Sequence, residues 1–367
     1  MNTKNLSEML KGCRPVKDKE GNIVVQSILN MQIVCLTTDA EYSMDDRFGN
    51  PLTSLTSSNS RYGEISFVNK ESKEVIIPTQ MAVLTKQSAQ NHGMTKAGYI
   101  AQKANVTYHD AGCVQGSQGG YFSGTAEFRM IPISMREMIF DTVGRPQDLS
   151  RIYPAIEKLG HDTQSGTGKY LDVYFNKFDK KLNEFIAHFE RPKNLIGIIV
   201  LIDGEIVAID KFPSFTYAEQ VWDSMIRDCY GSLAIISELN HKTAVNEFSQ
   251  TYEELKKNNR TTVVDLLEKS LKKTKERMTA NVHDRIQEVL DLTFDAIPDT
   301  EGQSTSRTAP KSYILKDIEN NYIGQIITEN EFNHLVSIIK RERFNPNALR
   351  EVNELRNKAR KMTPFKI

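Results

Sequence analysis

The stretch NLIGIIVLIDGEIVAIDKF, residues 194–212, decides the fold class of this chain. It contains two continuous apolar runs, and the dipeptide Asp203-Gly204 lies between them. An Asp-Gly pair in this position is a strong hairpin signal, because a type I′ turn needs a positive φ at both central residues. The stretch therefore predicts a β-hairpin made of two adjacent antiparallel strands.

Amphipathic helices are predicted on both sides of this hairpin. Upstream, apolar residues recur every three or four positions within residues 167–190, and Lys and Asn occupy the other face. Downstream, residues 218–239 predict a second helix with one apolar face. That face consists of Val221, Trp222, Met225, Ile226 and Cys229.

The N-terminal half is rich in short β-type runs. Residues 64–78 contain two β-branched runs around a polar turn, which predicts a hairpin. Further strands are predicted within 23–36, 81–85 and 125–133, and residues 313–339 predict a C-terminal β-meander of three strands. Strands and helices are thus grouped rather than alternating one for one. This grouping predicts an α+β fold with amphipathic helices packed against sheet.

Residues 23–340 are expected to form one elaborated α+β domain, with a helical insertion at about 240–295 and a flexible loop at 297–311. Residues 1–22 are polar and charged and indicate an N-terminal arm. Residues 341–367 form a basic extension with eight Lys or Arg against three Glu. Its charges are interleaved with Asn and Glu, so contact with nucleic acid is not expected. A solvated helix, or a segment that docks to a protein partner or to a second copy of the chain, is the preferred interpretation.

The charge balance excludes some classes of partner. The 47 Lys and Arg are matched by 47 Asp and Glu, so the formal net charge of +0 exerts no general attraction on nucleic acid or an anionic membrane. No apolar run approaches the roughly 18 residues of a membrane helix. The first residues lack the apolar core of a secretory signal, so a cytoplasmic protein is expected.

Cysteines and histidines give no metal-binding pattern. The 4 Cys are far apart and form no CxxC pair, and the 7 His never occur at HxH or HxxxH spacing. Structural zinc sites are usually built from such close pairs. We therefore predict no metal site and reduced thiols. The sequence identifies no cofactor.

The first candidate ligand site is the polar segment KQSAQNHG, residues 86–93, just past an apolar run. Lys86 can bind a phosphate through its positive charge, and Gln87 and Asn91 can form hydrogen bonds with a base or a ribose. The alternative is a polar turn whose side chains satisfy local backbone groups.

The second candidate is DAGCVQGSQGG, residues 110–120. Its glycines can turn backbone N–H groups into one concavity suited to an anion, although glycine-rich loops are also plain turns. Cys113 is a candidate nucleophile if His92 or His109 lowers its pKa, and a buried structural thiol otherwise. The complete candidate ligand set is Lys86, Gln87, Asn91, Asp110, Cys113, Gln115, Gly116, Gly120 and Asp210.

Two further features have competing interpretations. Asp210 ends an apolar strand, where a carboxylate is a ligand, a base or simply a solvated strand terminus. The segment QSGTGKY, residues 164–170, is similar to a phosphate loop but has Thr163 at the position of the first Gly and Tyr170 after the Lys. Ser165 or Thr167 is instead expected to cap the helix that follows.

Several segments, in chain order, resemble one family. They are VLTKQSAQN (83–91), DAGCVQGSQGGYF (110–122), LSRIYPAIEKL (149–159), SGTGKYLDVY (165–174), IGIIVLIDGEIVAIDKF (196–212), VWDSMIRDCYGSLA (221–234) and IGQIITENEFNHLVSI (323–338). Together they resemble the ARPP-type domain, named for its association with ADP-ribosylglycohydrolases and rhodanese/phosphatase-superfamily proteins, over residues from about 25 to 340. Lys86-Gln87 and Cys113-Val114 match family motifs, whereas Gln115 stands where the family usually has Glu.

The resemblance implies a cytosolic binding or accessory protein for an ADP-ribose- or NAD-like nucleotide, in a phage or bacterial conflict system. Two alternatives stay open. One is a hydrolase of an ADP-ribosyl or phosphoester bond, with Asp110 or Asp210 as general base. The other is a structural or assembly protein of a virus or mobile element, which holds its neighbours through the terminal segments.

Overall fold

The computed structural model describes residues 2–28, 31–39, 46–59, 61–85, 89–117, 119–124, 126–140, 152–202, 204–239, 282–299, 309–319 and 321–341. Lys86 and Gln87 lie outside these residues. So do most of the insertion predicted at 240–295, part of the loop predicted at 297–311, and the extension beyond Arg341.

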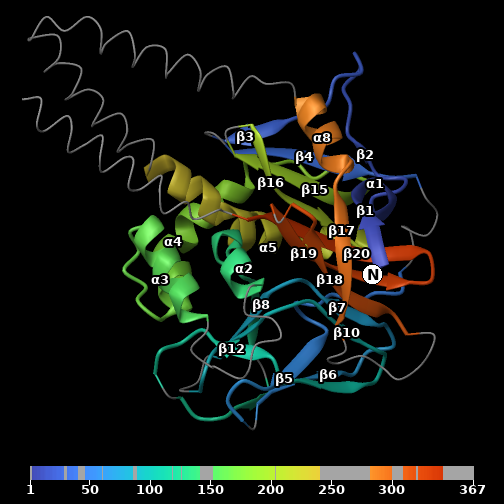
Figure 1. The fold of residues 1–367 in the computed structure, drawn as a ribbon. Helices are drawn as coiled ribbons and strands as arrows, with labels where there is room; N and C mark the ends of the chain where they lie inside the picture. The colour runs from blue at the N-terminus through green and yellow to red at the C-terminus, as the bar shows by residue number, and fades with distance from the viewer. Residues whose placement is uncertain are drawn as a thin grey trace, which may run out of the picture.

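The largest unit is a ten-stranded sheet in which every pairing is antiparallel (Figure 1). In sheet order its strands are β1 (Asn2–Asn5), β17 (Thr293–Asp299), β18 (Lys311–Asp317), β19 (Tyr322–Glu329), β20 (Phe332–Lys340), β16 (Glu205–Lys211), β15 (Leu195–Ile202), β4 (Met31–Thr37) and β2 (Arg14–Pro15), and β3 (Gln26–Ile28) also pairs with β4. The consecutive strands β18, β19 and β20 confirm the predicted meander, and the mixture of large sheets with grouped helices confirms the α+β class.

The predicted central hairpin is confirmed as the pair β15 and β16, in which Ile202 lies opposite Glu205. Gly204 has a φ of 77°, in the left-handed region that glycine enters at little cost. The hairpin lies between β4 and β20 in the sheet. Both of its strands are therefore interior strands, which explains why their apolar runs are nearly continuous rather than alternating.

Strands β5 to β14 form a second unit, which we call the β-rich lobe. It contains two four-stranded sheets and one two-stranded sheet. Their strands are β11 (Asn105–Tyr108), β6 (Ile65–Asn69), β5 (Leu55–Ser58) and β13 (Ser123–Gly124); β12 (Ala111–Cys113), β9 (His92–Met94), β8 (Met81–Leu84) and β14 (Glu127–Met130); and β10 (Gly98–Ile100) with β7 (Val75–Ile77). Apolar side chains from these sheets share one core, with Phe67, Met81 and Ile100 fully buried.

The hairpin predicted at residues 64–78 is wrong, although its two strands exist. β6 pairs with β5 and β11, whereas β7 pairs with β10. The polar turn between them bonds elsewhere: the Asn69 amide donates to the carbonyl of Ala101 at 3.0 Å, and the Glu74 N–H donates to the carbonyl of Arg47 at 3.0 Å. These contacts with distant segments separate the two strands.

Helices cover the sheets on several sides (Figure 1). They are α1 (Leu6–Met9), α2 (Ile133–Phe140), α3 (Tyr153–Asp162), α4 (Leu171–Ile186), α5 (Phe215–Ser224), the π-helix η2 (Met225–Tyr230) and α8 (Val282–Leu290), and residues 231–239 are also helical. Both predicted amphipathic helices are confirmed, as α4 and as α5 with η2. No helix within the described residues has the length and apolar character needed to cross a membrane.

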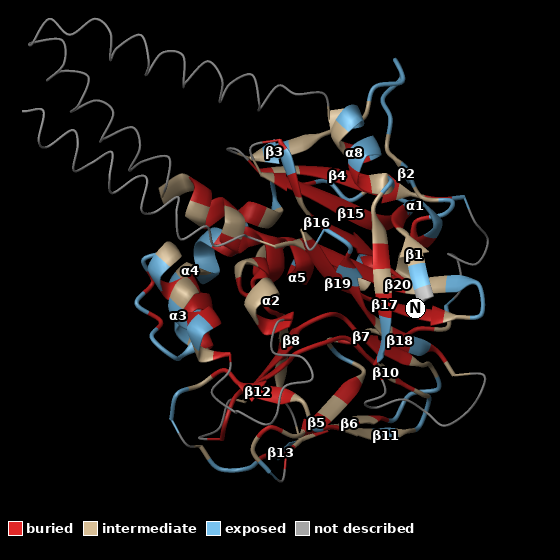
Figure 2. Ribbon diagram, in the orientation of Figure 1, coloured by how far each residue is buried: buried red, intermediate tan, exposed pale blue. Residues whose placement is uncertain are grey.

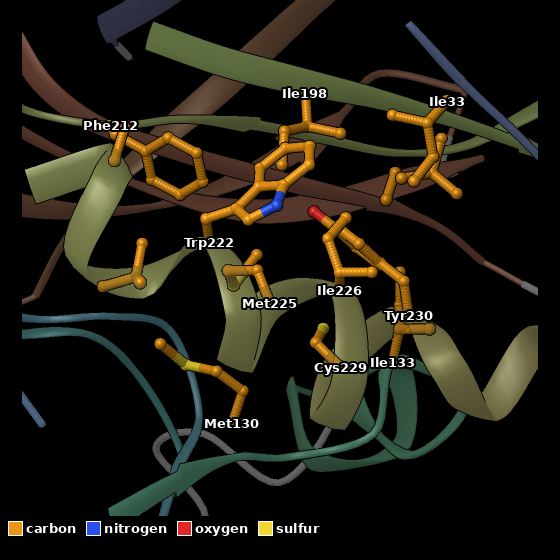
Figure 3. Packing of buried hydrophobic residues seen from close by; sticks show 14 of the residues in the cluster. Ile33, Met130, Ile133, Ile198, Phe212, Trp222, Met225, Ile226, Cys229 and Tyr230 are labelled. Atoms are coloured by element: carbon orange, nitrogen blue, oxygen red, sulfur yellow. The ribbon is translucent and has the colours of Figure 1, made fainter. Parts of the chain in front are cut away.

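The apolar face predicted around Trp222 is buried against the large sheet. Trp222 is 4% exposed, and Figure 3 shows its indole lying near Phe212 and Ile198, with Met225 and Cys229 farther along the same helical segment. Complete burial of one such large side chain contributes roughly 1.5–3 kcal/mol. Figure 2 shows that burial is concentrated in the central strands and in the helical faces turned toward them. This packing fixes α5 and η2 on one face of the sheet.

The opposite face of the sheet is covered partly by the N-terminal residues. β1 pairs with β17, and β2 pairs with β4. Leu6, Met9 and Leu10 are buried in a core that they share with α8 and the strands of the large sheet. Residues 2–15 of the segment interpreted as an arm are therefore part of the fold.

Candidate functional site

Two loops with glycine residues lie side by side at one edge of the β-rich lobe. Gln115 forms a bridge with Tyr170, and the N–H of Leu171 donates to the carbonyl of Val114 at 3.0 Å. A Cβ atom added to Gly116 would stand 2.7 Å from the Cβ of Lys169, so only glycine permits this approach. We call the surface formed by residues 115–117, 119–121 and 164–170 the two-loop surface.

The buried amide side chain of Gln90 holds the first loop from beneath. Its Nε2 donates to the carbonyl of Gln115 at 2.7 Å, and its Oε1 accepts from the N–H of Gly119 at 3.1 Å. Its own N–H donates to the carbonyl of Gly120 at 3.0 Å, and the Tyr153 hydroxyl donates to the carbonyl of Gln115 at 2.8 Å. These hydrogen bonds fix the loop in place.

The structure brings Asn91 and Gln115, two of the predicted ligand residues, together beneath this loop. The Asn91 Oδ1 accepts from the N–H of Thr85 at 2.7 Å, and the Asn91 N–H donates to the Gln115 Oε1 at 3.2 Å. The Gln115 Nε2 donates to the Ser117 hydroxyl at 2.9 Å. Asn91 therefore stabilises the turn that follows β8, while Gln115 is half-buried at the border of the two-loop surface.

Cys113 and His92 face each other across the pairing of β12 and β9, and both are buried. The His92 Nδ1 lies 2.9 Å from the carbonyl oxygen of Gln90, and its Nε2 is buried with no hydrogen-bond partner among the described residues. Burial lowers the pKa of His92 to about 4, so the ring is neutral at neutral pH. His109 is exposed and lies 2.9 Å from Glu64.

Lys169 supplies the cation of the two-loop surface. It is exposed, its ammonium lies 5.3 Å from the centre of the Tyr153 ring, and no described carboxylate forms an ion pair with it. Burial raises the pKa of Tyr153, and the nearby Cys113 and Tyr170 add to this effect, so its hydroxyl remains a donor. Gly120 is exposed, and an added Cβ there would have nothing within 4 Å.

Asp110 and Asp210, also predicted as ligand residues, lie apart from this surface. The Asp110 carboxylate accepts from the Thr95 hydroxyl at 2.8 Å, at the opposite end of β12 from Cys113. Asp210 is 3% exposed, so the solvated strand terminus considered for it is wrong. It lies 3.4 Å from the Arg136 guanidinium and accepts from the hydroxyls of Tyr230 and Ser337. We call these four residues the Arg136 network.

The predicted cap of α4 is also wrong. Tyr170 occupies the N-cap position, and its side chain makes no capping hydrogen bond. The Thr167 hydroxyl instead donates to the carbonyl of Ile156 at 3.1 Å, and the Ser165 hydroxyl accepts from that of Thr163 at 2.9 Å. These bonds tie the second loop to α3 and so position Lys169.

Sequence reasoning missed Gln90, Tyr62 and Tyr153 as contributors to this surface, and it considered Lys169 only within a phosphate-loop pattern that the segment does not fulfil. All but Tyr62 lie within segments that resemble the family, but nothing in their spacing links them to residues 115–121. The available signal was Gly116, because a glycine between polar residues often marks a close approach of another segment. Among the described residues, no three His, Cys, Asp or Glu side chains gather closely enough to hold a metal ion.

Comparison with known proteins gives one match. The family model described as ARG and Rhodanese-Phosphatase-superfamily-associated Protein domain matches residues 24–294, which is more than half of the chain. The matched range includes the β-rich lobe, the two-loop surface and the central hairpin, and it ends within β17. No curated protein and no solved structure matches the chain.

Proposed function

Since the chain belongs to the ARG and Rhodanese-Phosphatase-superfamily-associated Protein domain family, we propose that it is a cytosolic accessory protein that binds an ADP-ribose- or NAD-like nucleotide. The two-loop surface is its binding site. The family name gives an association with ADP-ribose chemistry and no reaction, so the argument for a ligand rests on the side chains of this surface.

Lys169 is the observation that carries the proposal. Its aliphatic chain lies against Gly116 and its ammonium lies near the Tyr153 ring. Lys169 forms no ion pair with a described carboxylate, so its charge is available to a ligand. The diphosphate of ADP-ribose or NAD provides the complementary anion. Gly120 leaves the backbone open to close approach, and Gln90 fixes the loop before the ligand arrives, which lowers the entropic cost of binding.

The positions of the carboxylates favour binding over hydrolysis. A hydrolase needs a general base within hydrogen-bond reach of the attacking water. The two carboxylates considered for this role are Asp110, which is bonded to Thr95, and Asp210, which belongs to the buried Arg136 network. Neither lies on the two-loop surface.

Calorimetric titration of the purified protein with ADP-ribose and with NAD tests the proposal. Lys169→Ala is expected to weaken binding about 10- to 150-fold, because hydrogen bonds to charged groups contribute roughly 1.5–3 kcal/mol. Lys180→Ala is the matched control, since Lys180 lies on the adjoining α4 and its side chain is 93% exposed. Absence of binding by the unmodified protein at millimolar ligand, or equal weakening by both variants, would refute the proposal.

A further inference from the structure

Tyr121 is an exposed aromatic side chain on a fixed backbone. It is 57% exposed, the largest exposed fraction of any described tyrosine. Hydrogen bonds hold the chain on both sides of it: the N–H of Gln90 donates to the Gly120 carbonyl at 3.0 Å, and the N–H of Phe122 donates to the Asn59 Oδ1 at 2.9 Å. The ring therefore projects from a position that the fold determines.

Tyr62 supports the Tyr121 ring from one side. The two ring centroids are 5.4 Å apart with an interplanar angle of 49°, a favourable tilted arrangement. Tyr62 is itself held by its hydroxyl, which donates to the carbonyl of Gly119 at 2.7 Å. A supported ring that keeps more than half of its surface in water is well placed to stack on a second planar group.

We infer that Tyr121 is the stacking platform for the purine base of the nucleotide, an inference that rests on the proposed function. Tyr121 and Lys169 belong to the two loops that meet at Gly116, so one ligand can place its base on the first and its diphosphate at the second. Stacking uses the face of the base, which adenine and guanine share. The site therefore takes purine nucleoside diphosphates as a class and discriminates little between the two bases.

The test compares three variants by calorimetric titration with ADP-ribose, ADP and GDP. Tyr121→Leu is expected to raise the Kd of all three ligands about 5- to 150-fold, the range found when a stacking aromatic is removed. Tyr121→Phe keeps the ring and is expected to stay within about threefold of the unmodified protein. Phe332→Leu is the matched control, because Phe332 is 48% exposed and lies on β20, outside the two-loop surface. All three variants are expected to keep the melting temperature, since both rings are largely exposed.

The outcomes separate this inference from the proposed function. If the unmodified protein binds neither NAD nor any of the three ligands, both fail. If ADP-ribose binds and Lys169→Ala weakens it while Tyr121→Leu does not, the binding function stands and the stacking platform is refuted. Equal losses for Tyr121→Phe and Tyr121→Leu would also refute stacking, because the hydroxyl would then be the essential group. A GDP affinity more than tenfold below that of ADP would refute the expected tolerance of the base.

Discussion

The Arg136 network and the two-loop surface both gather polar side chains, but only the two-loop surface leaves a charged side chain exposed. In the Arg136 network, a guanidinium that is 1% exposed meets the Asp210 carboxylate and the Ser337 hydroxyl. Its members come from α2, β16, η2 and β20. On the two-loop surface, Lys169 is exposed and forms no ion pair with a described carboxylate.

The difference indicates which polar cluster is structural and which one is open to a ligand. Where several elements cross, their side chains supply partners for one another, and water is excluded. Where two loops meet through glycine, the backbone fills the junction and the charged side chain is left pointing outward. The Arg136 network should therefore determine stability, and the two-loop surface should determine binding.

The largest expected effect is at Asp210. Asp210→Ala leaves the Arg136 guanidinium buried without its carboxylate, which is expected to lower the free energy of unfolding by about 3–5 kcal/mol in urea titrations. The double variant Arg136→Met/Asp210→Leu removes both charges and is expected to recover most of that loss. Should Asp210→Ala lose less than about 1 kcal/mol, the contrast between the two regions would disappear.

The next largest effect is expected at His92, which lies behind the two-loop surface. This effect is a dependence of the free energy of unfolding on pH. The pKa of His92 is lowered to about 4 by burial, so the unfolded chain takes up a proton between about pH 6.5 and 4 that the folded protein does not. The free energy of unfolding should fall by roughly 3 kcal/mol for this residue as the pH drops through this window. Above about pH 6.5 the contribution of His92 to stability is retained in full.

Urea titrations across this pH range measure the effect. His334, whose pKa burial also lowers to about 4, adds a similar dependence. His92→Gln should therefore reduce the acid sensitivity without abolishing it. Replacement of His161, whose side chain is 89% exposed, by Gln controls for the general loss of a histidine. An unchanged pH dependence in His92→Gln would mean that water already reaches the interior beneath the two-loop surface.

The smallest expected effect is the difference in stability between alanine substitutions at two glycines of the same loop. Gly116→Ala forces its new methyl group against Lys169 and is expected to cost about 1–3 kcal/mol of stability. Gly120→Ala meets open space and is expected to change stability by less than about 0.5 kcal/mol. If the ligand passes over Gly120, this second variant should still weaken ADP-ribose binding in calorimetry. Equal stabilities for the two variants would contradict the close contact of the loops.

Local signals in the sequence predicted the features that depend on neighbouring residues. The hairpin at Asp203-Gly204 and the apolar face around Trp222 each depend on residues that are close together in the sequence. Both predictions are confirmed. The hairpin at 64–78 failed because the polar turn bonds to Arg47 and Ala101, which no local pattern reveals.

Distant contacts explain what the sequence did not predict about the two polar regions. Asp210 was recognised as unusual, but its partners Arg136 and Ser337 lie 74 and 127 residues away along the chain. The glycines of residues 110–120 indicated a concavity for an anion or a plain turn, whereas Lys169 reaches that loop through the close approach at Gly116 and the bridge between Gln115 and Tyr170. Pairing over such distances depends on the complete fold, so composition and periodicity cannot show it.

The pairing of β1 with β17 has a consequence for how the protein is made. Asn2 lies opposite Ala296, so almost 300 residues of chain must be synthesised before β1 can find its partner. At roughly 5–20 residues per second, a ribosome needs about 15–60 s to reach β17 after β1. During that interval Leu6 and Met9, which are buried in the finished protein, await part of the core that covers them. The N-terminal residues can therefore complete their part of the sheet and of the core only after β17 has been made.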